Sequence, residues 1–240
     1  MIEIKNLTIA FGEQIVLENI SLDIPKGQIT TIVGQSGSGK SVLMKAIEAL
    51  IIPQNGEIRI DGLKLFSLSR KELNAARRKV AMLFQGAALL DSLNVYENVA
   101  LPLEENTSLG KQEIFRQVEE KLEMLGLSGL NEMLPAALSG GMKKRVALAR
   151  AIIRQPDYII YDEPTTGLDP IIAEEIMRLI LKLQNSYNIT SIVITHDRDC
   201  IKRLQGNIVM LHDKKIIFDG KYADFINSNL EIIKKFIVVK

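Results

Sequence analysis

The sequence predicts an α/β fold built around a largely parallel sheet, and three observations support this prediction. Apolar runs of strand length recur, and several are continuous, as expected of strands that are buried on both faces. Segments with helical periodicity lie between these runs, which is the alternation typical of α/β proteins. A glycine-rich loop, residues 34–41, joins one run to one helical segment. At 240 residues, we expect one large core with a small subdomain.

The expected strands are, in chain order, Ile2–Ile9, Ile29–Val33, Ile58–Ile60, Val80–Phe84, Tyr158–Tyr161, Ile192–Thr195 and Ile208–Leu211. Asn55-Gly56 and Asp61-Gly62 lie near short early strands and are predicted to form hairpin turns of an antiparallel edge layer. Asp213-Lys214 is predicted to form a final hairpin. The parallel sheet therefore carries an antiparallel layer at its edge.

The expected helices are Lys40–Leu50, Lys111–Leu125, Met142–Arg154, Ile172–Gln184 and Arg198–Leu204. Residues 87–137 are rich in helix signals and are predicted to form an inserted helical subdomain between two halves of the core, residues 1–86 and 138–220. Residues 221–240 form a C-terminal extension with the apolar spacing of short amphipathic helices, which either pad the core or reach a neighbouring subunit.

The composition excludes several kinds of function. The formal charge is +1, from 30 basic and 29 acidic side chains, so no overall field favours nucleic acid or an anionic membrane. Two basic groups, Arg77–Lys79 and Lys143–Arg145, lack interleaved aromatic residues and indicate a solvated helix face. No apolar stretch approaches the ~20 residues that span a bilayer, and no signal peptide is evident. We therefore expect a cytoplasmic protein without direct membrane insertion, whose only cysteine, Cys200, is buried or inert.

The strongest motif is the glycine-rich loop, which matches G-x-x-x-x-G-K-[ST] between an expected strand and an expected helix. Its residues are Gly34, Gln35, Ser36, Gly37, Ser38, Gly39, Lys40 and Ser41. Glycines allow backbone N–H groups to surround phosphate oxygens at the helix N-terminus. Lys40 is expected to reach the β- and γ-phosphates, and the Ser41 hydroxyl to ligate Mg²⁺. The alternative interpretation is an ordinary Gly-Ser turn.

Two carboxylates, Asp162 and Glu163, follow an apolar strand at the edge of a parallel sheet where ligands bind. Adjacent strand residues point to opposite faces, so the two carboxylates are expected to have different tasks. Asp162 is suited to hold Mg²⁺, and Glu163 to act as the general base for an attacking water. The alternative is a solvated acidic strand end.

The segment Leu138–Met142 reads Leu-Ser-Gly-Gly-Met and precedes an expected helix that Ser139 would cap. Gly140 and Gly141 would let a phosphate approach the first helical amides, which creates a second anion site in the same chain. A single nucleotide bound to one core needs only one such anion site, so the second site is left for another ligand. The alternative is an ordinary capped helix.

These motifs, in this order over essentially the whole chain, resemble those of the ABC ATPase family. Thr166–Asp169 and a strand ending at His196 complete the pattern. The resemblance implies a P-loop NTPase core that binds ATP and Mg²⁺. It also implies a head-to-tail dimer with a second copy of the chain, in which Ser139, Gly140, Gly141 and Asp169 contact ATP held by the other subunit.

The resemblance assigns further residues to the site. Gln85 matches the residue that contacts Mg²⁺ and the attacking water, and His196 matches the histidine that contacts the γ-phosphate. Alone, such a glutamine is usually exposed and such a histidine structural. Asp169 also suits a helix cap before Pro170. Phe11 matches the aromatic residue that stacks on adenine, although many members have tyrosine there, and core packing is the competing interpretation.

The resemblance also implies partners. Residues 87–103 would form part of a groove for a cytoplasmic helix of a membrane permease, although their leucines equally suit the subdomain core. Phe84–Leu93 and Gly141–Arg145 are similar to the ATPases of Mce/Mla systems, which move phospholipids between two membranes and include an Mce-domain protein. This implies a location on the cytoplasmic face of the inner membrane. The alternatives are an importer of amino acids or other small solutes and a soluble ABC ATPase of translation or DNA repair. The single cassette and the lack of sustained heptads disfavour the soluble class.

Overall fold

The computed structural model describes residues 1–238 of the chain. Its larger sheet has the strand order β10-β9-β3-β8-β7-β6, and the pairs from β9 to β6 are all parallel. The strands are β3 (Ile29–Val33), β6 (Val80–Leu83), β7 (Tyr158–Asp162), β8 (Thr190–Ile194), β9 (Asn207–His212) and β10 (Lys215–Lys221). Only β10 is antiparallel to its neighbour, and Asp213-Lys214 make the predicted hairpin between β9 and β10.

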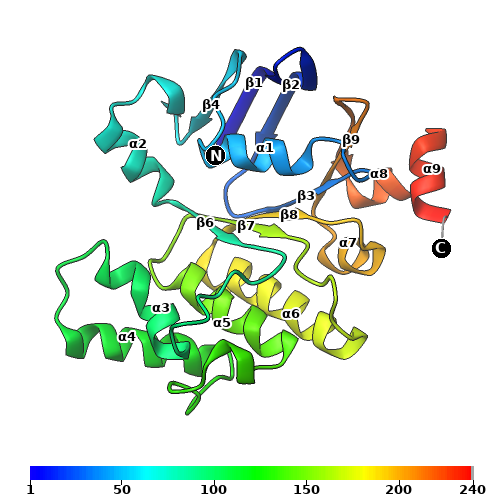
Figure 1. The fold of residues 1–240 in the computed structure, drawn as a ribbon. Coiled ribbons are helices and arrows are strands. Elements are labelled where there is room, and N and C mark those ends of the chain that lie inside the picture. The colour runs from blue at the N-terminus through cyan, green and yellow to red at the C-terminus, as the bar shows by residue number, and fades with distance from the viewer. Residues whose placement is uncertain (239–240) are drawn as a thin grey trace.

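A second, antiparallel sheet has the order β2-β1-β4-β5 and lies on one side of the larger sheet (Figure 1). Its strands are β1 (Ile2–Phe11), β2 (Gln14–Ile24), β4 (Asn55–Ile60) and β5 (Leu63–Lys64). A 3-10 turn, η1 (Leu65–Ser67), and the helix α2 (Arg70–Arg77) lead from this sheet back to β6. The predicted α/β class and antiparallel layer are confirmed.

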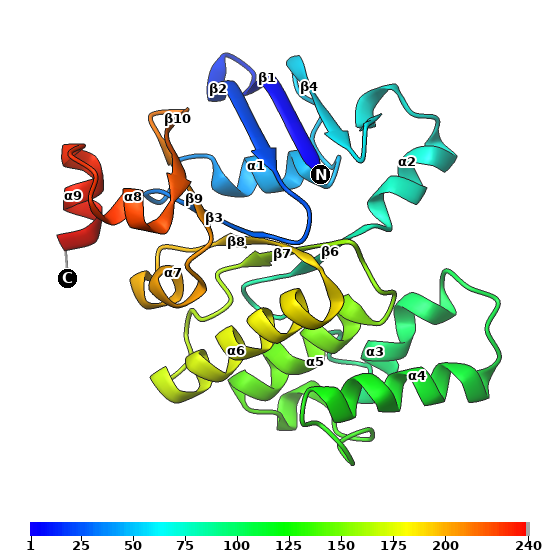
Figure 2. The ribbon, with the colours of Figure 1, turned by 180° about the vertical axis from the view of Figure 1, so that it is seen from behind.

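Helices cover the larger sheet on both faces (Figures 1 and 2). Helix α1 (Lys40–Ile47) lies on the side of the antiparallel sheet. The opposite side carries α3 (Val95–Glu104), α4 (Lys111–Met124), the 3-10 turn η2 (Pro135–Ala137), α5 (Gly140–Ile152) and α6 (Pro170–Tyr187). The chain closes with α7 (Arg198–Leu204), α8 (Tyr222–Ile226) and α9 (Glu231–Val238), which lie beside β9 and β10.

The larger sheet separates two hydrophobic cores, as the continuous apolar strands predict. Tyr158 and Ile160 of β7 pack into the core that includes α1 and the antiparallel sheet. Ile159 and Tyr161 pack into the core formed with α3, α4, α5 and α6. Because side chains alternate along a strand, each apolar strand serves both cores at once. The carboxyl edge of this sheet is therefore rigidly placed, and the candidate site lies there.

The prediction of a hairpin turn at Asn55-Gly56 is wrong. Both residues lie within β4, where Gly56 sits at a bulge opposite Asn6 and has φ of 86°. A Cβ on Gly56 would lie 2.4 Å from the Asn6 carbonyl oxygen, so glycine is required by the close approach of β1. Asp61-Gly62 does make its predicted turn, since Ile60 pairs with Leu63.

Residues 87–137 contain α3, α4 and η2, and their treatment as a separate subdomain stays a prediction. Among residues 1–238, no helix is long and apolar enough to cross a membrane.

Candidate nucleotide-binding site

The phosphate loop connects the fully buried β3 to the first turn of α1. Gly34, Gly37 and Gly39 all have positive φ, and a Cβ on Gly34 would lie 2.4 Å from the Leu211 carbonyl oxygen. The Lys40 ammonium donates hydrogen bonds to the carbonyl oxygens of Gly34 and Gln35, both at 2.8 Å. The loop thus folds around its own lysine, and only glycine allows this backbone path.

Asp162 ends β7, and Glu163 follows it in the left-handed region with φ of 47°. Strand alternation predicts that the two carboxylates point to opposite faces of the sheet. Glu163 instead lies just past the end of β7, so strand alternation does not set its direction, and both carboxylates line the same cavity. Burial raises the pKa of Asp162, and the adjacent Glu163 adds to that shift. Burial lowers the pKa of Lys40, and the two carboxylates oppose this effect.

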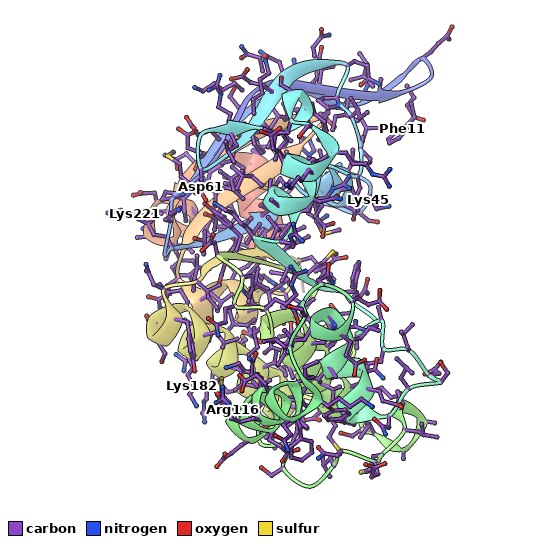
Figure 3. The ribbon with its side chains drawn as sticks, turned by 90° about the vertical axis from the view of Figure 1, so that its left-hand side faces the viewer. Phe11, Lys45, Asp61, Arg116, Lys182 and Lys221 are labelled. Atoms are coloured by element: carbon purple, nitrogen blue, oxygen red, sulfur yellow. The ribbon has the colours of Figure 1, made fainter. Side chains whose placement is uncertain are left out.

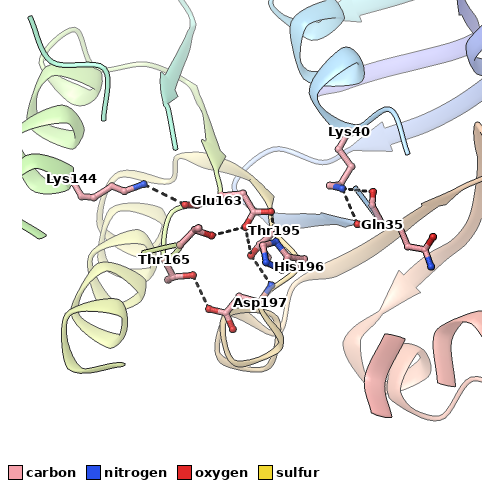
Figure 4. A network of polar contacts seen from close by, with 10 residues as sticks. Gln35, Lys40, Lys144, Glu163, Thr165, Thr195, His196 and Asp197 are labelled. Carbon is pink, nitrogen blue, oxygen red and sulfur yellow. Dashed lines mark hydrogen bonds and ion pairs between the residues drawn. The ribbon is translucent and has the colours of Figure 1, made fainter. Parts of the chain in front are cut away.

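The Glu163 carboxylate is held by three neighbouring side chains (Figure 4). Its Oε1 atom lies 2.6 Å from Nδ1 of His196. Its Oε2 atom accepts hydrogen bonds from the hydroxyls of Thr166 at 3.0 Å and Thr195 at 3.3 Å. The Glu163 side chain is 12% exposed, whereas the His196 ring is 65% exposed. A fixed carboxylate beside an accessible imidazole is suited to accept a proton from water.

Glu163 and His196 line one cavity of about 580 Å³, which we call the phosphate-loop cavity. It is lined by Val16, Gly34, Gln35, Ser36, Gly37, Gly39, Lys40, Ser41, Val42, Gln85, Asp162, Glu163, Ile194, His196 and Phe236. The predicted loop, carboxylates, glutamine and histidine are therefore brought together, although β3, β6, β7 and β8 are separated in the sequence.

The cavity suits ATP with Mg²⁺. Ser41, Gln85 and Asp162 offer hydroxyl, amide and carboxylate oxygens, the hard ligands that Mg²⁺ accepts alongside phosphate oxygens. Within the part of the chain that the structure describes, no group of three or more His, Cys, Asp or Glu side chains forms a complete metal cage. Such a donor set fits a cation that shares its coordination with nucleotide phosphates.

Two residues that were predicted to bind the nucleotide, Phe11 and Ser38, lie outside this cavity. Phe11 is 53% exposed near the end of the β1–β2 hairpin (Figure 3) and does not line the cavity. The apolar side chains that line the cavity are those of Val16, Val42, Ile194 and Phe236. Ser38 does not line the cavity either, and its hydroxyl is buried without a hydrogen-bond partner in residues 1–238. The adenine contact of Phe11 stays a prediction.

The signature residues also lie outside their own chain's cavity. The Ser139 hydroxyl accepts a hydrogen bond from the Met142 amide, which confirms the predicted helix cap of α5. Asp169 likewise caps α6, through the amides of Ile171 and Ile172. A Cβ on Gly141 would lie 2.5 Å from Cγ2 of Ile172, so this glycine also lets α5 approach α6 closely.

Sequence reasoning missed two residues of this region. Phe236 comes from the C-terminal extension, and only its place in the fold brings it to the cavity. Lys144 of α5 is 4% exposed and donates to the backbone carbonyls of Gln85 and Glu163. Its place in a basic run predicted a solvated face, and the structure contradicts this for Lys144. Cys200 is buried as expected, and burial raises the pKa of its thiol to about 12.

Residues 17–166, which hold the phosphate loop and both carboxylates, match the ABC transporter family. The chain belongs to this family. It is an ABC ATPase, the ATP-binding cassette of a transporter. The intermembrane phospholipid transport system ATP-binding protein MlaF of Haemophilus influenzae is 41% identical, over 95% of this chain and 86% of that protein. The probable ribonucleotide transport ATP-binding protein mkl of Mycobacterium leprae is 37% identical, over 98% of this chain and 68% of that protein.

Solved structures of ABC cassettes agree with the fold. A dimeric ATP-binding cassette, MJ0796, in a post-hydrolysis state with ADP and Pi, is 36% identical with a TM-score of 0.82. That match covers 92% of this chain and 98% of the other. The cbiO1 protein of Clostridium perfringens, part of the ABC transporter complex cbiONQ, is 29% identical with a TM-score of 0.87, over 99% of this chain and 95% of the other.

Proposed function

We propose that two copies of this ABC ATPase assemble head to tail and power a membrane permease that moves phospholipid, or another hydrophobic molecule, between two membranes. One observation carries the catalytic part of this proposal. Glu163 is held by His196, Thr166 and Thr195 at the cavity that contains Lys40. The same arrangement supports hydrolysis in addition to nucleotide binding.

In the proposed reaction, Glu163 accepts a proton from water while the water oxygen attacks the γ-phosphorus. The bond from the γ-phosphorus to the oxygen of the leaving ADP breaks. Lys40 and the loop amides stabilise charge on the phosphates, and His196 holds the Glu163 carboxylate in place. Mg²⁺, held by Ser41, Gln85 and Asp162, would supply further charge neutralisation.

The position of the signature supports a dimer. Ser139, Gly140 and Gly141 begin α5 outside the phosphate-loop cavity of their own chain. Phosphate binding at this helix start is favoured by its free amides, so a second chain's nucleotide is its natural ligand. The dimeric state of MJ0796 is consistent with this assembly. In the dimer, Asp169 would stand near the opposite subunit because α6 begins beside Gly141.

A groove between the sheet and the helices suits the permease. It has a volume of about 760 Å³ and includes Phe84, Leu90, Leu101 and Pro102. Leu90 is exposed there, whereas Leu103 is buried in the helical core, so the leucines of residues 87–103 are divided between the groove and the subdomain core. Arg78 and Arg154 also line the groove, and burial together with the Arg78 charge lowers the pKa of Arg154. We infer that a cytoplasmic permease segment with an acidic side chain docks here, at the inner membrane.

The cargo proposal is supported by the relatives. MlaF is named for intermembrane phospholipid transport, and the match covers nearly all of this chain. A system of that kind would add an Mce-domain protein as a partner that this chain does not touch. The mycobacterial relative is named for ribonucleotide transport, so a small-solute transporter is the second candidate.

Replacing the proposed base tests the catalytic assignment. Glu163→Gln keeps the size of the side chain but removes the proton acceptor, so we expect kcat for ATP hydrolysis to fall by about 100-fold or more. ATP binding should persist and should trap a closed dimer, measured by light scattering. Glu123→Gln, an exposed change on α4, is the control. Near-normal turnover in Glu163→Gln would refute the base assignment.

Isolation of the native complex tests the partners and the cargo. We expect a permease and an Mce-domain protein to copurify, with bound phospholipid detected by mass spectrometry. Arg154→Glu should reduce permease recovery, because it reverses the charge of the groove. Recovery of a solute-binding protein without an Mce-domain subunit would contradict the lipid proposal.

A further inference from the structure

Lys144 carries a buried positive charge that the proposed reaction does not use. It lies on α5, is 4% exposed, and approaches the Glu163 segment from the side opposite the phosphate loop (Figure 4). Its ammonium donates hydrogen bonds to two backbone carbonyls, that of Gln85 at 2.5 Å and that of Glu163 at 3.3 Å. A methionine would fill similar space without burying a charge, so packing alone does not explain this lysine.

The two carbonyls belong to the residues that follow β6 and β7, which are adjacent parallel strands. The side chains of Gln85 and Glu163 line the phosphate-loop cavity. Lys144 therefore joins the backbones of two segments whose side chains contact that cavity. A buried ammonium with well-placed acceptors holds such segments at a fixed separation, because losing either bond leaves polar groups unpaired.

The same helix begins at the signature. Ser139 caps α5, and Lys144 lies about 7.5 Å further along the helix axis, within the same continuous helix. The N-terminal end of α5 would contact the partner's ATP, while Lys144 contacts the loops that serve the chain's own ATP. A helix is rigid over this distance, so a displacement at one end reaches the other.

We propose that Lys144 is a positioning residue that transmits engagement of the signature by one ATP to Gln85 and Glu163 of the other ATP site. This inference rests on the proposed head-to-tail dimer and on the proposed roles of Gln85 and Glu163. It adds a route between the two sites within one chain. The route acts through the position of the Gln85 and Glu163 backbones.

Steady-state kinetics of the full chain provide the first test. Lys144→Met should lower kcat by roughly ten-fold or more and leave KM for ATP within about two-fold, because positioning acts on the reacting state. Lys144→Arg should restore most of kcat, since it keeps a charged donor. Lys143→Met, on the same helix, is the control, because the Lys143 side chain is only partly buried and the bonds to the Gln85 and Glu163 carbonyls come from Lys144. Unchanged kcat in Lys144→Met, or no rescue by arginine, would overturn the proposal.

Mixed dimers separate transmission from local structure. Two differently tagged chains are purified together, and the second chain always carries Glu163→Gln, so that the first chain's site supplies the turnover. Lys40→Ala in the second chain leaves the first chain's signature without ATP, which should slow the first site. If Lys144 transmits the engagement of the signature, Lys144→Met in the first chain should make the rate of the first site independent of Lys40→Ala in the second chain. The combination should then be about as slow as Lys144→Met alone, and the two losses in rate should not multiply.

Losses that multiply in the mixed dimers would show that Lys144 acts only locally and would overturn the proposal. Thermal unfolding of each variant is measured in parallel, since a purely structural lysine would change the melting temperature without removing the dependence on the partner. Failure of the proposed catalytic function gives a different result, because a Glu163→Gln homodimer would then still hydrolyse ATP. In that case, the role of Lys144 is decided by the steady-state comparison alone: a lower kcat in Lys144→Met with KM nearly unchanged, and rescue by Lys144→Arg.

Discussion

At the scale of single residues, the structure uses ionic contacts to join distant segments. Asp61, in the turn after β4, accepts hydrogen bonds from Lys79 at 2.7 Å and from the Tyr158 hydroxyl at 2.6 Å, and pairs with Lys26 at 2.8 Å. Burial alone would raise the pKa of Asp61, but these donors outweigh it and hold the pKa well below its usual range. One carboxylate thus connects the antiparallel sheet to β7.

Asp61→Asn should destabilise the fold by about 2 kcal/mol near neutral pH, because it leaves the donors without a charged acceptor. A carboxyl group whose pKa is lower in the folded state stabilises the fold above its unfolded pKa, and the effect is lost as pH falls. The stability difference between the parent and Asp61→Asn should therefore shrink below about pH 4. Urea unfolding at several pH values measures it, with exposed Asp23→Asn as the control. A difference that does not change with pH would contradict this.

At the scale of secondary-structure elements, α9 connects the C-terminal extension to the nucleotide site. Ile233 of α9 is buried, and the Phe236 ring packs edge to face on Phe225 with centroids 6.1 Å apart. Arg198 donates a hydrogen bond to the Ile237 carbonyl at 2.5 Å. These contacts place Phe236 in the wall of the phosphate-loop cavity.

Phe236→Ala should weaken ATP binding by roughly three- to ten-fold, because it removes an aromatic wall of the cavity. Isothermal titration with a non-hydrolysed ATP analogue measures the change. Phe115→Ala, an exposed aromatic on α4, is the control. An unchanged Kd would mean that the Phe236 ring packs on Phe225 without contacting the nucleotide.

Sequence patterns predicted the elements that are deeply buried. They did not predict elements that are specified mainly by local polar contacts. The strands at Ile29–Val33 and Tyr158–Tyr161 were recognisable because both of their faces are apolar. Helix α2 has few apolar residues, but its capping box of Ser69 and Glu72 is a sequence signal that could have revealed it. Asn94 and Glu97 form the same motif at α3.

The site was predictable to the extent that its residues stand in contiguous motifs. The phosphate loop and the Asp162-Glu163 pair are of this kind. Lys144 and Phe236 are not, because their roles depend on contacts with β6, β7 and the cavity that arise only in the folded chain. Periodicity describes which side of a helix is apolar, and it does not reveal that a lysine is buried against two carbonyls.

At the scale of the whole molecule, the separation of signature and phosphate loop makes a definite prediction about assembly. In the proposed dimer, each ATP site combines the phosphate loop of one chain with the signature of the other. Lys40→Ala should inactivate the phosphate loop. Gly140→Asp should inactivate the signature, since an added carboxylate repels phosphate. Asp at the start of a helix is favourable, and a Cβ on Gly140 meets only Leu168 at 3.4 Å, so the second variant should fold.

Each of these variants alone should hydrolyse ATP very slowly. A mixture should regain activity, because hybrid dimers contain one site with an intact loop and an intact signature. The ATPase rate is measured as the ratio of the two variants is changed, and mixing Lys40→Ala with Lys40→Gln is the control. No recovery at any ratio would show that each chain completes its own site.

The alternation of side chains along β7 also bears on how the molecule opens. Tyr158 and Ile160 belong to one core, and Ile159 and Tyr161 to the other. Neither core can loosen without exposing one face of this strand, so its amide hydrogens should exchange with solvent only when the protein unfolds globally. Asp162 and Glu163 directly follow this part of the strand. We therefore expect the acidic pair to be attached to a slowly exchanging segment, while helices that cover only one face of the sheet open locally more often.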